Sequence, residues 1–347
     1  MRGLTIVPRP QGKLSAAANV LSVECLTYPS IHTSSSSSTS SLTESVREYR
    51  EIHGRTYTQR TDYWGPNDER ASESLELSHF WITDFLDGKL FLAPIGDNPQ
   101  RVLDMGTGNG IWAIDMADTY PSAEITGVDL SPIQPSWVPA NCKFVIDDFE
   151  QEWTWPLNHF DYVHARSLEA CFADLRGTMK EVFEHTKPGG WIEILEFETE
   201  MQSQSQELPD DHVYKRWNRA MVLAADRMGK PTHNVGRGRM TAALDEAGYV
   251  DLVHQRFKIP LGAWPADPKL RRIGRCTHEW VDEGLENFGL FVFKKFAGMS
   301  YAECQVMFAE YRAAMKDPKL QSFYWMHILY ARKPEASEEE TAPAATE

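Results

Sequence analysis

The run Arg101-Val-Leu-Asp-Met-Gly-Thr-Gly-Asn-Gly110 carries the clearest structural signal in the chain. Its apolar part, from Val102 to Met105, predicts a strand. The apolar side chains that follow the run recur at helical spacing: Ile111, Trp112, Ile114 and Met116. The glycines between them permit positive φ and let a ligand approach the backbone, and the N–H groups at a helix start attract an anionic group. The run therefore predicts a strand, a tight turn and a helix that together cradle a nucleotide-type ligand.

The spacing of the glycines argues against a dinucleotide. The fingerprint G-x-G-x-x-G requires a third glycine at position 111, where this chain has Ile111. Asp104 lies just before the first glycine, and a carboxylate there would repel a pyrophosphate but would suit a ligand that carries a positive charge. A glycine turn that only packs a helix against a sheet is the simpler alternative, and a hydride-transfer enzyme is the alternative of another class.

The segment Asp104-Met-Gly-Thr-Gly-Asn-Gly110 closely resembles motif I of the class I S-adenosylmethionine-dependent methyltransferases. In that family the loop backbone wraps the methionine moiety of a ligand that carries an ammonium, a sulfonium and a carboxylate. The resemblance implies that S-adenosylmethionine is the cofactor. It also implies that the residues contacting the cofactor include Asp104, Gly106, Thr107, Gly108 and Gly110.

Composition limits the partners of the chain. The 347 residues are 42% hydrophobic, which is enough for one large core, or for one core with an appended lobe. The 35 Lys and Arg against 50 Asp and Glu give a net charge of −15, so direct nucleic-acid binding is not expected. No segment approaches the roughly 20 continuous apolar residues of a membrane span. The five cysteines are scattered without C-x-x-C spacing and predict neither a disulfide framework nor a metal site.

Both ends of the chain have the composition of disordered segments. Residues 1–43 form a serine-rich extension that includes the run Ser34–Ser38, and residues 334–347 form an acidic, alanine-rich tail. The intervening residues 44–333 are expected to form one methyltransferase domain, in which 44–92 are a helical cap and 101–200 bind the cofactor.

Two further strands place acidic residues near the expected cofactor. The first, Glu124–Asp129, ends in a carboxylate that can accept hydrogen bonds from ribose hydroxyls. The second, Cys142–Asp147, is followed by Asp148 and Phe149. The resemblance implies that Asp148 faces the adenine amino group and that Phe149 lies beside the ring. A solvated charged turn is the alternative for this acidic run.

The loop after Asp129 and the segment before the glycine loop narrow the resemblance. Leu130, which follows Asp129, is a further cofactor contact that the resemblance implies, and it opens a proline-broken loop. This loop, together with a tyrosine-rich stretch, a P-N-D-E element and a helix bearing His79, is similar to the fungal LaeA-like methyltransferases. The chain departs from that family's pattern at Ala71 and Ser74. Asn67 or Asp68 is suited to cap the helix.

His164 is the candidate catalytic residue. It ends a fourth strand, Phe160–His164, at the carboxyl edge where open α/β sheets bind ligands. A histidine with an ordinary pKa near ~6.5 can accept a proton at neutral pH, so His164 is a candidate general base. A structural His164 that bonds the cofactor's methionine end or the backbone is an equal alternative. Glu193 and Glu196, on the fifth strand, are other candidates for a base.

The second half of the chain, residues 201–333, is predicted to choose the substrate. Helices are expected over 168–186, 210–228 and 240–247, a strand over 250–259, and a mostly helical insertion over 267–316. The run Phe323–Tyr330 is rich in residues that favour strands, and the family places it as an antiparallel seventh strand. The expected fold is therefore an α/β, Rossmann-like, seven-stranded class I methyltransferase sheet with an N-terminal helical cap and a helical insertion.

The expected reaction is in-line methyl transfer, in which proximity supplies most of the catalysis. Three roles are compatible with the resemblance. A regulatory methyltransferase of secondary metabolism, acting with velvet-type protein partners in nucleus and cytoplasm, is slightly favoured by the long serine-rich leader and the acidic tail. A tailoring enzyme that methylates a small-molecule acceptor is favoured by the aromatic residues of the cap and of the insertion. A non-catalytic cofactor-binding partner is the third.

Overall fold

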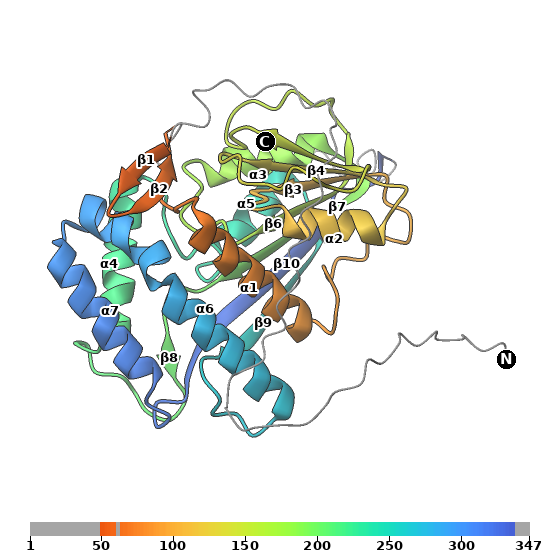
Figure 1. Cartoon of the computed structure of the whole chain (residues 1–347). Coiled ribbons are helices and arrows are strands. Elements are labelled where there is room, and N and C mark those ends of the chain that lie inside the picture. Colours follow the sequence, from red (N-terminus) through yellow and green to blue (C-terminus); the bar gives the residue numbers. More distant parts are fainter. Residues whose placement is uncertain (1–48, 60–62, 337–347) are drawn as a thin grey trace, which may run out of the picture. The chain divides into compact units, whose positions relative to one another are not determined.

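The computed structural model describes residues 49–59 and 63–336 (Figure 1). The predicted extension over 1–43, and the predicted tail from residue 337 onward, lie outside the described residues. Within the described residues, every helix is too short or too polar to cross a membrane.

A single mixed sheet organises the domain. Its strands run in the order β5 (Cys142–Ile146), β4 (Glu124–Asp129), β3 (Arg101–Met105), β6 (Phe160–Arg166), β7 (Thr186–Phe197) and β10 (Ser322–Arg332). The first five are parallel, whereas β10 is antiparallel to β7 and to β9 (Val250–Pro260) on its other side. The predicted Rossmann-like order with an antiparallel last strand is confirmed. An eighth strand, the two-residue β8 (Gln202–Ser203), was not predicted; it pairs with the start of β10.

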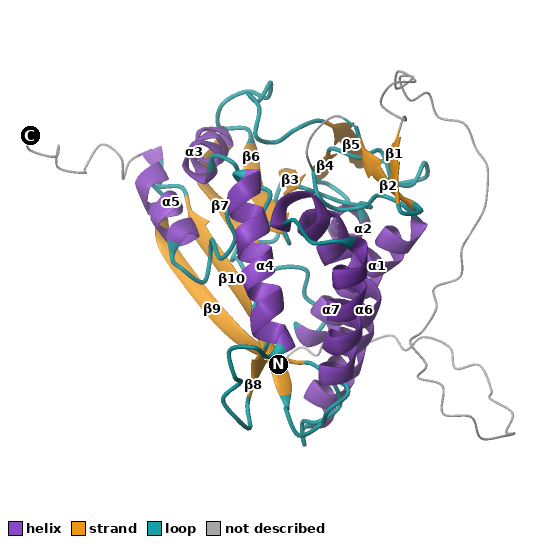
Figure 2. Ribbon diagram, turned by 90° about the vertical axis from the view of Figure 1, so that its left-hand side faces the viewer, coloured by secondary structure: helices purple, strands orange, loops and turns teal. Residues whose placement is uncertain are grey.

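Helices cover both faces of this sheet, so its central strands carry buried apolar side chains on both faces, beside the buried polar residues Asp104, His164 and Glu193. One face is covered by α3 (Leu175–His185) and α5 (Arg239–Ala247), and α2 (Ile111–Thr119) packs on the other (Figures 1 and 2). Along β3, Leu103 faces the first cluster and Val102 the second, as expected from the alternation of side chains in a strand.

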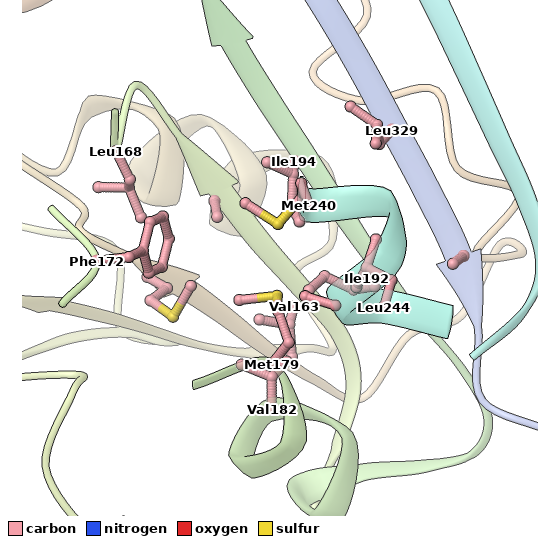
Figure 3. Packing of buried hydrophobic residues seen from close by; sticks show 14 of the residues in the cluster. Val163, Leu168, Phe172, Met179, Val182, Ile192, Ile194, Met240, Leu244 and Leu329 are labelled. Atoms are coloured by element: carbon pink, nitrogen blue, oxygen red, sulfur yellow. The ribbon is translucent and has the colours of Figure 1, made fainter. Parts of the chain in front are cut away.

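The larger core cluster lies between the sheet and the pair α3 and α5 (Figure 3). Its members labelled there are Val163, Leu168, Phe172, Met179, Val182, Ile192, Ile194, Met240, Leu244 and Leu329. They come from β6, β7, β10, both helices and the loop after β6. The cluster therefore fixes that loop, which follows the candidate residue His164, against the core.

The helix expected over 168–186 begins only at Leu175, so the prediction was wrong for its first residues. Ser167 and Ala170 have φ values of 59° and 57°, which a helix does not allow. Asp174 then caps α3, because its carboxylate accepts a hydrogen bond from the N–H of Gly177 at 2.9 Å. Residues 167–174 therefore form a shaped loop at the carboxyl edge of the sheet.

The cap contains more than the predicted helix. Before α1 (Glu69–Phe85) the chain forms an antiparallel hairpin of β1 (Tyr49–Ile52) and β2 (Arg55–Thr58). Its two turn residues, His53 and Gly54, both have positive φ, as a tight hairpin turn requires. Asp68 is the cap of α1: its carboxylate accepts a hydrogen bond from the N–H of Ala71 at 3.0 Å.

The insertion is helical, as predicted. It consists of α6 (Pro268–Val292), a π-helical turn labelled η2 (Phe293–Ala297) and α7 (Tyr301–Met315). Helix α6 packs beside α1, and α7 and α4 (Val213–Met228) pack against α6, on the side of the sheet opposite α3 and α5 (Figure 2). Ion pairs join α1 to α6, including Arg272 with Asp84 at 2.7 Å. The cap and the insertion therefore form one wall over the carboxyl edge of the sheet.

Candidate functional site

The glycine loop between β3 and α2 has the backbone that the sequence predicted. Gly106, Gly108 and Gly110 have φ values of 70°, 60° and 83°, a region that other residues rarely adopt. A Cβ on Gly110 would lie 2.3 Å from the ring of Phe144, and one on Gly106 would lie 2.4 Å from Leu168. Both the conformation and the close packing therefore require glycine here.

Asp129 at the end of β4 holds this loop. Its carboxylate accepts hydrogen bonds from the N–H of Gly108 at 2.8 Å and from the N–H of Ser131 at 2.9 Å. Burial raises the pKa of Asp129 to about 6, against the lowering effect of these N–H groups. Leu130, beside it, is half-buried. The acid predicted for the ribose thus also shapes the glycine loop.

Asp104 and His164 form a buried pair beneath the loop. Nδ1 of His164 lies 2.7 Å from one carboxylate oxygen of Asp104, and Thr107 donates a hydrogen bond to the other at 2.5 Å. His164 is 2% exposed and stacks on Trp112 with the ring centroids 3.8 Å apart. Burial lowers the pKa of His164, although the Asp104 carboxylate opposes this shift. The ring is therefore neutral at pH 7 and donates to Asp104 from Nδ1.

This arrangement favours the structural alternative for His164. His164 does not line the cavity described below. Trp112 covers a face of its ring, and Asp104 is bonded to its Nδ1. The role of His164 as a general base stays a prediction. Both carboxylate oxygens of Asp104 already accept hydrogen bonds, from Thr107 and from His164. A direct contact between Asp104 and a cofactor ammonium therefore also stays a prediction.

The helix α1 lies against the glycine loop. Leu75 of α1 is 3.0 Å from the position that a Cβ on Gly108 would take, and Asn109 donates to the carbonyl of Ser72 at 3.3 Å. His79, which the sequence singled out, bridges three elements: its Nε2 lies 2.9 Å from Asp115 of α2 and its Nδ1 lies 3.2 Å from Arg166 of β6. The cap is thus fastened to the cofactor half of the domain.

Asp148 and Phe149 follow β5, the neighbour of β4 in the sheet. An oxygen of Asp148 accepts a hydrogen bond from the N–H of Glu150 at 3.1 Å, and the ring of Phe149 packs against Phe172 with the centroids 5.6 Å apart. Because β5, β4 and β3 are adjacent and parallel, Asp148, Asp129 and the glycine loop follow neighbouring strands at the same edge. The structure therefore assembles the predicted cofactor residues along one edge.

A separate cavity of about 230 Å³ opens beside this edge. Aromatic side chains from the end of β7, the insertion, α4 and β10 form much of its wall: Phe197, Trp217, Trp280, Phe288, Tyr311 and Tyr324. Residues 63–66 and α1 complete it from the cap. Two residues connect the cavity to the glycine loop. Leu75, which lies against Gly108, also lines the cavity. Leu168, which lies against Gly106, stands in the chain between the lining residues Ser167 and Glu169.

Three glutamates that line the cavity carried little or no signal in the sequence. Glu196 was, with Glu193, a candidate for a base, whereas Glu169 and Glu198 were not singled out. Their position was the available signal, because Glu196 lies at the carboxyl end of β7, Glu198 just after it and Glu169 just after β6, and ligands bind at the carboxyl ends of parallel strands.

Comparison with known proteins agrees with the geometry. A family model described as a methyltransferase domain matches residues 77–253. "Methyltransferase pytC" of Aspergillus terreus is 35% identical over 309 residues, which cover 88% of this chain and 94% of that protein. "Secondary metabolism regulator LAE1" of Cochliobolus heterostrophus is 31% identical, covering 82% and 94% of the two chains. "Protein-methionine methyltransferase laeA" of Emericella nidulans is 30% identical, covering 83% and 77%.

These relatives extend over most of the described domain, from the cap to the insertion, and the family model spans the glycine loop and the strand-end acids. The order of the strands is the Rossmann-like order predicted for this family. The chain therefore belongs to the class I S-adenosylmethionine-dependent methyltransferases, within the LaeA-like family.

Proposed function

We propose that the enzyme transfers the methyl group of S-adenosylmethionine to a small, largely apolar acceptor bound in the aromatic cavity. The observation that carries the proposal is the cavity itself, which lies beside the cofactor edge and is lined by eight aromatic side chains: the six named above, together with Tyr63 and Trp64 of the cap. Cavities of this kind suit small molecules whose surface is mostly apolar. The 35% identity to a protein named methyltransferase pytC, over nearly its whole length, also supports it.

The residues of the cofactor edge fit the cofactor. Positive-φ glycines leave the loop backbone open to a ligand, and Asp129 and Asp148 follow neighbouring strands where hydroxyl and amino groups can donate to them. These residues would hold S-adenosylmethionine, which supplies an electrophilic methyl group when bound. The acceptor's nucleophile forms a bond to the methyl carbon as the carbon–sulfur bond breaks, and the electron pair stays on sulfur. The chain's part is to align acceptor and cofactor and to exclude water.

A second candidate function is regulation of secondary metabolism with protein partners of the velvet type, in nucleus and cytoplasm. It is supported by the names of relatives at 30–31% identity, which are called secondary metabolism regulators or a protein-methionine methyltransferase. The acceptor would then be a protein side chain. The two functions differ in where the transferred methyl group ends.

An isotope-partition experiment tests the proposal. Purified enzyme is incubated with methyl-labelled S-adenosylmethionine and a fungal extract, and the label is measured separately in the low-mass and protein fractions. We expect label in the low-mass fraction. The variant Ala225→Phe adds a ring to α4 inside the cavity and should abolish this transfer, whereas Leu223→Phe places a ring at an exposed site on the same helix and should not.

Binding of S-adenosylhomocysteine by both variants shows whether they fold. Label that appears only in protein, or low-mass transfer that persists in Ala225→Phe, contradicts the small-acceptor proposal. Label confined to protein and equal in both variants would favour the regulatory function.

A further inference from the structure

Two buried glutamates on the cavity wall have oxygens without hydrogen-bond partners. Oε1 of Glu196 accepts a hydrogen bond from the N–H of Leu168 at 2.7 Å, and Oε1 of Glu169 accepts one from the N–H of Asn234 at 3.1 Å. Oε2 of each is buried and has no partner among the residues that the structure describes. Most buried polar atoms in proteins are paired, so two unpaired carboxyl oxygens at one cavity require an explanation.

The two carboxyl groups interact electrostatically. Burial, with the negative charge of Glu169 nearby, raises the pKa of Glu196 well above its usual value. Burial also raises the pKa of Glu169 to about 7, against the lowering effect of Arg239 and of the backbone N–H groups of residues 233–235. Cys171, whose thiol stays protonated because burial raises its pKa, lies close to the pair. Burial and mutual repulsion therefore oppose the simultaneous ionisation of both carboxyl groups.

The rest of the wall favours a positively charged guest. Among the residues that the structure describes, none that lines the cavity is a lysine or an arginine. Aromatic rings such as Trp217, Trp280 and Tyr324 present faces that attract cations. The third glutamate, Glu198, is already engaged, because His327 lies 3.0 Å and Arg256 3.1 Å from its Oε1. The unpaired oxygens thus belong to Glu169 and Glu196 alone among the three.

We propose that the acceptor is an amine, and that Oε2 of Glu169 and Oε2 of Glu196 receive its N–H groups. The inference rests on the proposed function and names its substrate class. Binding of an ammonium supplies the missing hydrogen-bond donors and favours the ionised form of the pair. A carboxylate or phosphate in the same position would be repelled by it.

The same pair accounts for the proton that must leave before transfer. The ammonium gives one proton to the carboxylate of the pair and becomes a free amine with a lone pair. The amine nitrogen then attacks the methyl carbon of the sulfonium, the carbon–sulfur bond breaks, and S-adenosylhomocysteine and a methylated ammonium result. Charge balances, because the positive charge of the sulfonium passes to nitrogen and the proton passes to the glutamate pair.

Binding of matched probes tests the inference without requiring turnover. The probes are three molecules with one ring system: tryptamine, its alcohol analogue tryptophol, and indole-3-propionate. Each is titrated calorimetrically into enzyme saturated with S-adenosylhomocysteine at pH 7, in two buffers of different ionisation enthalpy. We expect tryptamine to bind roughly 10- to 100-fold more tightly than tryptophol, as one or two charge-assisted hydrogen bonds allow, and the carboxylate to bind weakest.

We also expect proton release when tryptamine binds, because a cation favours the ionised form of the two carboxyl groups. The double variant Glu169→Gln/Glu196→Gln should lose both the amine preference and the proton release. Glu193→Gln is the matched control: Glu193 is a buried glutamate on the same strand as Glu196, but it accepts from the N–H groups of Leu92 and Ala93 and does not line the cavity.

Four results overturn the inference: no binding of tryptamine to wild type, equal binding of amine and alcohol, an amine preference that survives in the double variant, or a loss of it in Glu193→Gln. If the double variant binds S-adenosylhomocysteine as weakly as it binds tryptamine, the carboxyls serve the cofactor's own ammonium and the inference also fails. Methyl transfer to a small acceptor without any amine preference would remove this inference and leave the proposed function standing. An amine preference in binding, with label transferred only to protein, would overturn the proposed function and, with it, the assignment of the bound amine as the methyl acceptor.

Discussion

Replacing His164 by phenylalanine separates a positioning role from a catalytic one. The phenyl ring can keep the stack on Trp112, whose centroid lies 3.8 Å from that of the imidazole. It removes the N–H that faces Asp104 at 2.7 Å and leaves a carboxylate that is 3% exposed with Thr107 as its remaining side-chain donor. Removing one partner of such a buried pair costs about 3 kcal/mol. For a domain of about 290 residues the melting temperature should fall by about 5 °C.

The pH dependence gives a second readout. The pKa of His164 is lowered in the folded protein, chiefly by burial, so below about pH 6.5 the unfolded chain binds a proton that the folded chain does not. The stability that wild type gains from burying a neutral His164 is therefore lost as the pH falls below about 6.5. The variant lacks the imidazole, so the stability gap between wild type and variant should narrow toward acid pH.

Thermal unfolding of wild type, His164→Phe and His164→Gln across pH 5–8 measures both effects, and glutamine serves as the control because its amide can still donate to Asp104. Methyl transfer is measured on the same samples at a temperature where all are folded. The positioning account is refuted if His164→Phe melts like wild type while turnover falls and the pH–rate profile loses its limb near neutrality, because that pattern belongs to a general base.

Three further changes probe other parts of the fold. Glu193→Gln should stabilise the protein by up to about 3 kcal/mol at pH 8, because burial raises the pKa of Glu193 to about 7 and the folded state resists its ionisation. Urea unfolding measures this gain, which should vanish below about pH 4.5, where the carboxyl group is protonated in both states. Gly110→Ala should weaken S-adenosylhomocysteine binding and lower stability more than Gly88→Ala does. Both glycines have φ near 80°, but only the Cβ at position 110 would meet a ring, that of Phe144. Equal losses of stability would contradict this clash. Arg55→Ala should cost about 3 kcal/mol and loosen the cap, seen as faster amide exchange in α1, because it breaks a buried ion pair with the helix cap; unchanged exchange would show that the cap is held elsewhere.

The sheet was predictable because its signals are local. Strands such as Arg101–Met105 are short apolar runs that end in glycine or acid, and the chain order of a Rossmann-like fold then determines which strands are neighbours. The start of α3 was missed because residues 167–174 are apolar enough to look helical, while the positive φ of Ser167 and Ala170 depends on packing against the core.

The acceptor cavity was predictable only in kind. The aromatic cap and insertion suggested an apolar pocket. Its polar part brings together Glu169, in the loop after β6, and Glu196, at the end of β7, and the sequence does not reveal the shape of that loop. The role of His164 could not be decided either. The sequence places a histidine at a strand end but does not show whether its ring faces solvent or stacks on Trp112 beneath the glycine loop.

The most direct test of the account is a crystal structure of the enzyme with S-adenosylhomocysteine and tryptamine. The account predicts that the cofactor's density lies along the edge formed by Gly106, Asp129 and Asp148, that the probe occupies the aromatic cavity, and that its nitrogen lies within hydrogen-bond distance of Glu169 and Glu196. Cofactor density inside the aromatic cavity, or a probe bound away from the two glutamates, would contradict it.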